Sequence, residues 1–135
     1  MEASDTTSES LPFEVSPAEA AELIENGAQL IDVRQDYEFD AAHLAGAKQI
    51  GLQEVAERRD EIDKDNKVLF YCRVGNRSAM AAQAFQEAGF DVSSLAGGIA
   101  AWIDAGQAIE PADGYVAEPG QAAAILESRS RAESK

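Results

Sequence analysis

Cysteine, histidine and basic residues are scarce in this 135-residue chain, which has one cysteine and one histidine. One cysteine cannot form an internal disulfide, and one cysteine with one histidine cannot complete a four-ligand zinc site. Only 11 lysines and arginines stand against 25 aspartates and glutamates, giving a net charge of −14. Because nucleic acids and anionic membranes are bound through lysine and arginine patches, this composition argues against both as partners.

Long hydrophobic segments are also missing. The apolar run Val68–Cys72 is typical of this chain, whereas a membrane-spanning helix needs about 20 apolar residues. Residues 1–10 offer almost nothing to a core and lack the positive and apolar regions of a secretory signal, so we predict a disordered leader there. The predicted location is the cytoplasm.

The acidic surplus should make the folded chain repel itself at low ionic strength. Because the screening length falls to about 3 Å in 1 M salt, concentrated salt would relieve this repulsion. We hypothesise a halophilic source organism. The alternative is an acidic protein from an ordinary environment.

Strand and helix signals alternate along the chain, which is short enough for a single domain. Strands are predicted at Phe13–Val15, Leu30–Val33, near Gln49 and Ile50, at Val68–Tyr71 and at Val92–Leu95. Helices are predicted between the cap Ser16 and Gly27, from the cap Asp36 to Ala42, and at Leu52–Ile62, Ser78–Ala88 and Ile99–Ala105. This alternation predicts an α/β fold with a parallel sheet covered by helices on both faces.

The segment most informative about chemistry is Tyr71–Ser78, between the strongest strand and the strongest helix. In open α/β sheets, ligands bind where strands end and helices begin. A helix N-terminus offers free N–H groups to an anion, and Gly75 lets the preceding loop curl around it. The same field stabilises a thiolate, so Cys72 is predicted to be largely ionised at neutral pH.

Arg73 and Arg77 lie within five residues of Cys72 in a chain with few cations. This placement predicts an anionic substrate. The alternative is a buried structural cysteine beside two solvated surface charges, with Arg73 the arginine expected to point outward.

Three segments, taken in order, resemble the rhodanese family of sulfurtransferases over about Phe13–Gly106. They are Asp32-Val33-Arg34 followed by Glu38 and Ala42–Ala47, then Cys72–Ser78, then Leu95–Trp102. Ala42 and Ala45 depart from the glycine and proline that are common there. The resemblance implies a five-stranded parallel sheet flanked by helices on both faces. We place the domain at residues 11–110 and a C-terminal extension, either a short helix or disordered, at 111–135.

The resemblance also implies a reaction. The Cys72 thiolate would take the outer sulfur of thiosulfate as a persulfide and pass it to a thiol, cyanide or a protein, with no metal or cofactor. The substrate-binding residues would be those of the loop cradle, Arg73, Val74, Gly75, Asn76, Arg77 and Ser78. Four residues would support the site structurally, with Arg34 and Glu38 forming an ion pair beneath it: Asp32, Arg34, Glu38 and His43.

Two other functions remain open. A Cdc25-like phosphatase or an arsenate reductase would use a similar cradle, but those phosphatases have five residues between cysteine and arginine, whereas Cys72 and Arg77 enclose four. A non-enzymatic rhodanese-fold binding module or sulfur relay would keep the same fold. The sequence does not identify the acceptor, so it does not separate a relay from an enzyme.

Overall fold

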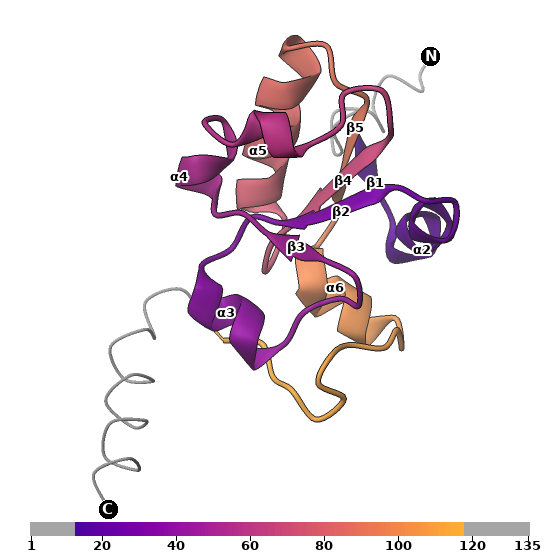
Figure 1. Ribbon diagram of the computed structural model, residues 1–135. Coiled ribbons are helices and arrows are strands. Elements are labelled where there is room, and N and C mark those ends of the chain that lie inside the picture. Colours follow the sequence, from indigo (N-terminus) through magenta and orange to yellow (C-terminus); the bar gives the residue numbers. More distant parts are fainter. Residues whose placement is uncertain (1–12, 118–135) are drawn as a thin grey trace, which may run out of the picture.

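Five parallel strands form the centre of residues 13–117, the part of the chain that the computed structural model describes. They are β1 (Glu14–Val15), β2 (Gln29–Asp32), β3 (Lys48–Gln49), β4 (Val68–Tyr71) and β5 (Val92–Leu95), in the spatial order β1-β5-β4-β2-β3. The helices are α2 (Pro17–Glu25), α3 (Asp36–Ala41), α4 (Leu52–Val55), α5 (Asn76–Glu87) and α6 (Gly98–Asp104), with a 3-10 turn at Arg59–Glu61. The helices lie on both sides of the sheet (Figure 1), so the predicted α/β architecture is confirmed.

Strand β4 divides the core into two layers, because successive strand side chains point to opposite faces. Val68, Phe70 and then Cys72 belong to a cluster that includes α5 residues, whereas Leu69 and Tyr71 belong to a second cluster that includes α6 residues. All four β4 residues are buried. Cys72 therefore sits at the end of the most enclosed strand, under α5.

Three helix starts differ slightly from the prediction, and the smallest difference is at α6, which begins at Gly98 rather than Ile99. The cap of α2 is as expected: the Ser16 hydroxyl accepts from the Glu19 N–H, and the Ser16 N–H donates to the Glu19 carboxylate. In α3 the capping residue is Gln35 rather than Asp36, because the Gln35 N–H donates to the Glu38 carboxylate at 3.1 Å. Helix α5 begins at Asn76, two residues before the predicted start.

The single helix predicted over Leu52–Ile62 is wrong. The structure has the four-residue α4, a turn, and the 3-10 turn Arg59–Glu61. Val55 and Ile62 are both buried, but the intervening turn carries Arg58 and Arg59, so no apolar side chain ties it to the core. The chain instead changes direction and brings Ile62 into the core.

The chain beyond residue 105 returns across the end of α3. His43 and Glu110 exchange two backbone hydrogen bonds of 2.8 Å, and the Tyr115 N–H donates to the Ala41 carbonyl. Ala117 is fully buried. The predicted leader at residues 1–10 and a predicted short helix at Gln121–Glu127 lie outside the described residues. Within residues 13–117, no helix is long and apolar enough to cross a membrane.

Candidate active site

Cys72 occupies the predicted junction between β4 and α5 and is buried, with 1% of its surface exposed. Three residues connect it to the helix, and Gly75 takes the left-handed conformation, with φ 107°, directly before α5. A side chain is strained at that φ, and a Cβ at Gly75 would also lie 3.2 Å from the Gly97 nitrogen. The loop can therefore curl around the sulfur only because residue 75 is glycine.

Two backbone N–H groups converge on the Cys72 sulfur. Gly75 donates at 3.1 Å and Ser78 at 3.4 Å, and the Ser78 hydroxyl lies 3.5 Å from the same atom. Hydrogen-bond donors aimed at one sulfur stabilise negative charge on it. Arg73 and Arg77 are both half-buried, and Val74 and Asn76 are exposed.

The turn between β5 and α6 holds this loop from the other side. The Ile99 N–H donates to the Cys72 carbonyl at 2.8 Å, and the Ala100 N–H donates to the Arg73 carbonyl at 3.1 Å. A Cβ at Gly98 would overlap both carbonyl oxygens. The sequence predicts Gly97-Gly98 only as a turn into the last helix and as part of the family resemblance, whereas in the structure Gly98 also fixes the active-site backbone.

Ser94 is a residue of the site that sequence reasoning missed. Its hydroxyl lies 2.8 Å from the Ser78 hydroxyl, and both serines are fully buried. Ser94 lies in the middle of a buried strand, where serine is less usual than an aliphatic residue. That was the available signal, but nothing in the sequence indicated the partner.

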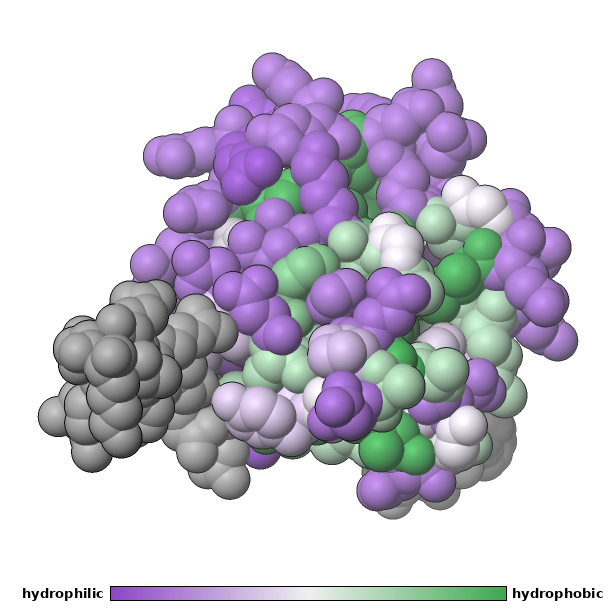
Figure 2. Space-filling model, turned by 60° about the horizontal axis from the view of Figure 1, so that its bottom comes forward, coloured by the Kyte–Doolittle hydropathy of each residue, from purple (hydrophilic) through white to green (hydrophobic). Residues whose placement is uncertain are grey.

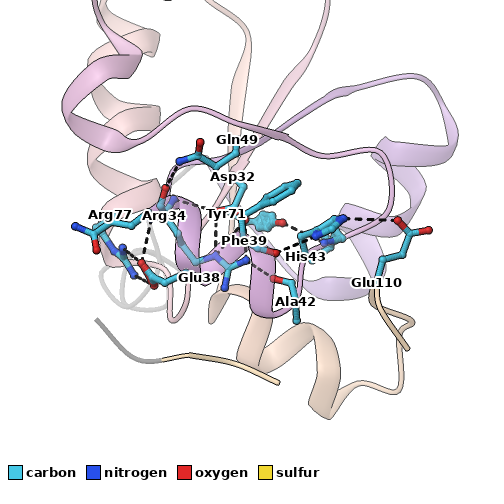
Figure 3. Close-up of polar contacts among 12 residues, drawn as sticks. Asp32, Arg34, Glu38, Phe39, Ala42, His43, Gln49, Tyr71, Arg77 and Glu110 are labelled. Carbon is cyan, nitrogen blue, oxygen red and sulfur yellow. Dashed lines mark hydrogen bonds and ion pairs between the residues drawn. The ribbon is translucent and has the colours of Figure 1, made fainter. Parts of the chain in front are cut away.

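The predicted ion pair between Arg34 and Glu38 is wrong. Arg34 pairs with Asp32, with 2.7 Å between Nη2 and Oδ2, and Glu38 pairs with Arg77 (Figure 3). Asp32 is only two residues before Arg34, and its carboxylate accepts from both the Arg34 backbone N–H and the guanidinium. Asp32 takes up the Arg34 Nε and Nη2 donors, and the Arg34 Nη1 is buried without a hydrogen-bond partner among the described residues. The Glu38 carboxylate instead faces α5, where it pairs with Arg77.

Burial and pairing set the charges of these groups. Burial disfavours the Arg34 cation, but the hydrogen bond and the charge of Asp32 outweigh it and raise the Arg34 pKa. Burial also disfavours the Glu38 carboxylate, yet hydrogen bonds from Arg77 and from the Gln35 N–H bring the Glu38 pKa below its ordinary value. The hydrogen bond to Glu38 raises the pKa of Arg77, with a smaller contribution from the charge of Cys72. All three residues are therefore charged at neutral pH.

Arg34 and His43 hold the chain around α3. Arg34 donates from Nη2 to the Ala42 carbonyl at 2.6 Å. The His43 ring stacks on Phe39, and its Nδ1 lies 3.0 Å from the Phe39 carbonyl. Its Nε2 lies 3.6 Å from the Glu110 carboxylate, on the opposite side of the close-up from Arg77 (Figure 3). These contacts place His43 among structural groups rather than at the sulfur.

A cavity of about 510 Å³ opens beside Arg77. Apart from that arginine, its lining combines carboxylate and amide side chains with four other residues: Gln35, Asp36, Gln49, Gln53 and Glu54, together with Val33, Tyr37, Gly51 and Leu52. Around the loop, Val74 and Met80 are exposed apolar side chains, at 41% and 62%. Figure 2 shows hydrophobic and weakly polar residues gathered on the face that includes the bottom of Figure 1, with strongly hydrophilic residues above them. Among residues 13–117, no cluster of three or more histidine, cysteine or acidic residues could hold a metal ion.

The chain is similar to known proteins over most of the described residues. The family model for the rhodanese-like domain matches residues 16–105. A relative in Pseudomonas aeruginosa strain LESB58 is named "Thiosulfate sulfurtransferase GlpE" and is 37% identical over 100 residues. The match covers 73% of this chain and 87% of the relative's chain. The structure of a rhodanese-related protein from Thermoplasma volcanium is 28% identical, with a TM-score of 0.67, and covers 71% of this chain and 95% of that one. A structure from Rhodopseudomonas palustris, described as a protein of unknown function and "possible tyrosine phosphatase", is 29% identical, with a TM-score of 0.65 and coverage of 72% and 83%.

Proposed function

The chain belongs to the rhodanese-like domain family, and on that premise we propose that it moves sulfane sulfur from thiosulfate to a thiophilic acceptor through a persulfide on Cys72. The observation that carries the proposal is the convergence of the Gly75 and Ser78 N–H groups on the Cys72 sulfur. These donors are in place before any substrate arrives, so they need no reorganisation during the reaction.

The proposed reaction has two displacement steps. The Cys72 thiolate attacks the outer sulfur of thiosulfate, a new S–S bond forms, and sulfite leaves with the electron pair of the old bond. An acceptor such as cyanide or a thiolate then attacks the terminal sulfur of the persulfide, and the Cys72 thiolate is released. Covalent catalysis of this kind replaces one difficult transfer with two easier ones.

The two arginines are proposed to divide the work of binding the donor. Arg77 is already neutralised in part by its two-point pair with Glu38, and a quarter of its side chain is exposed. Arg73 has a buried Nε with no hydrogen-bond partner among the described residues. Arg73 therefore brings the less compensated charge to the anion, and Arg77 brings a guanidinium that is held in place.

A protein acceptor suits the surroundings of the site better than nucleic acid does. The net charge of −14 repels a polyanion, whereas Val74 and Met80 offer exposed apolar contacts beside the loop. A sulfur relay therefore remains the second candidate, and it would use the same persulfide. A cytoplasmic location stays a prediction.

The deciding experiment compares wild type with Cys72→Ser in a thiosulfate:cyanide sulfurtransferase assay. We expect thiocyanate formation by wild type only, and an intact mass increased by one sulfur atom after thiosulfate treatment of wild type only. A folded wild-type protein that gains no sulfur would overturn the proposal. A rate with an aryl phosphate that is lost in Cys72→Ser would indicate a phosphatase instead.

A further inference from the structure

We propose that Ser94 is a positioning residue for the reactive sulfur, because its hydroxyl donates to Ser78 and so directs the Ser78 proton toward Cys72. The inference rests on the proposed function in taking Cys72 as the reacting group. It concerns the ionisation of that group, however, which can be measured whether or not the protein transfers sulfur.

The direction of the hydrogen bonds follows from counting protons. Each serine hydroxyl has one proton to donate. The Ser94 hydroxyl contacts the Ser78 hydroxyl at 2.8 Å and has no other hydrogen-bond partner among the described residues. If Ser78 donated to Ser94, the Ser94 proton would be buried without an acceptor, which is unfavourable. Ser94 therefore donates, and Ser78 accepts.

This assignment leaves the Ser78 proton free for one of two other acceptors. The Gly75 carbonyl lies 3.3 Å from the Ser78 hydroxyl oxygen, and the Cys72 sulfur lies 3.5 Å from it. A charged acceptor forms a stronger hydrogen bond than a neutral one. The proton should therefore turn to the sulfur when Cys72 is a thiolate and to the carbonyl when it is a thiol.

The hydroxyl pair acts beside fixed charges that the serine variants leave in place. On the loop and on α5 these are Arg73 and Arg77, and on α3 Glu38 pairs with Arg77. Asp32, at the end of β2, pairs with Arg34, which lies two residues after that strand end. Neither β5 nor the first turn of α6 contributes a charged side chain. A change in the ionisation of Cys72 on removal of a serine hydroxyl therefore reports the hydroxyl itself.

The test is the pH profile of the thiolate, followed by its ultraviolet absorbance, with the matching Cys72→Ser protein subtracted. The chain has no other cysteine, so the signal belongs to Cys72. We expect the midpoint of the thiolate titration to rise by about one pH unit in Ser78→Ala, which is a tenfold loss of thiolate below the midpoint. In Ser94→Ala the midpoint should rise by about half a pH unit. The double variant should match Ser78→Ala, because Ser94 acts through Ser78.

The matched control is Ser93→Ala, a neighbouring buried serine on the same strand whose side chain points to the other face. It should leave the midpoint unchanged. Ser94→Thr keeps the hydroxyl and Ser94→Val removes it at similar size, so this pair decides the question if Ser94→Ala does not fold. The inference is overturned if hydroxyl removal at position 94 leaves the midpoint at the wild-type value, or if its effect persists in the Ser78→Ala background.

Discussion

The Arg77 guanidinium and the Glu38 carboxylate form a two-point ion pair from α5 to α3, with N–O distances of 2.8 and 2.9 Å. Glu38 has no exposed surface, whereas a quarter of the Arg77 side chain is exposed. The pair joins the first turn of α5, which closes the Cys72 loop, to the helix that follows β2. Any substitution of Arg77 therefore acts on the fold as well as on the site.

Arg77→Ala should destabilise the protein by about 3 kcal/mol, because it leaves the Glu38 carboxylate buried without its partner. The double variant Arg77→Ala/Glu38→Gln should recover much of that loss, since a neutral amide replaces the unpaired charge. Denaturant unfolding of the four proteins in this cycle, at neutral pH, measures both effects. Equal free energies of unfolding for Arg77→Ala and for the double variant would contradict the prediction.

Arg77 should also influence capture of the donor. We expect the KM for thiosulfate to rise more than kcat falls, both in Arg77→Ala and in the double variant, where the effect on stability is reduced. Arg73→Ala should also raise the KM, since it removes the less compensated charge, but it leaves the Glu38 pair intact and so should not carry the loss of stability. Unchanged thiosulfate kinetics in both arginine variants would mean that the anion site has been misassigned.

Acid should weaken the protein partly through Glu38. Its pKa is lowered, since the hydrogen bonds from Arg77 and the Gln35 N–H and the positive charges of Arg77 and Arg34 outweigh the effect of burial. A carboxylate whose pKa is lower in the folded state contributes stability above its unfolded pKa of about 4.3, and loses that contribution as the pH falls toward the folded value. The unfolding free energy of wild type should therefore fall more steeply than that of Glu38→Gln below about pH 4.3. Parallel curves would show that Glu38 is not the group responsible.

Gly98→Ala should disable the site, because its Cβ would overlap the carbonyl oxygens of Cys72 and Arg73 and displace the loop. A displacement of about 1 Å lowers kcat/KM by about 100-fold. The matched control is Gly46→Ala. Gly46 also has a positive φ, 83° against 63° for Gly98, but its added Cβ would meet nothing within 4 Å. Equal losses of activity in the two variants would attribute the effect to backbone strain rather than to the contact.

The location of the site could be predicted from sequence because it depends on local patterns. The apolar run ending at Tyr71 marks a buried strand, and the loop through Gly75 leads directly into a helix, so Cys72 had to lie where strand and helix meet. The parallel sheet covered by helices follows from the alternation of strand and helix signals, whereas the strand order β1-β5-β4-β2-β3 was not predicted.

The polar partners could not be predicted, because they depend on how distant elements approach each other. Glu38 is four residues after Arg34, a helical spacing that suggests a pair, but α3 begins at Asp36 and so excludes Arg34. Its actual partner comes from α5, 39 residues away. In the sequence, Ser94 likewise has no feature that distinguishes it from other strand residues. Its role depends on the packing of α5 on β5, which places the Ser78 and Ser94 hydroxyl oxygens 2.8 Å apart.

Salt should raise the melting temperature, because the chain carries 25 acidic against 11 basic residues. Screening weakens the exposed ion pairs as well, among them Lys48–Glu61 and Lys67–Asp91. Such pairs contribute little, however, and the unpaired acidic surplus is larger, so relief of repulsion should dominate. The matched variant is Glu25→Gln/Glu87→Gln, which removes two exposed acids from the last turns of α2 and α5, where the helix dipole disfavours negative charge. It should melt higher than wild type in dilute buffer and gain less from 1 M potassium chloride. A wild-type melting temperature that is the same in both buffers would contradict both the repulsion argument and the hypothesis of a halophilic source.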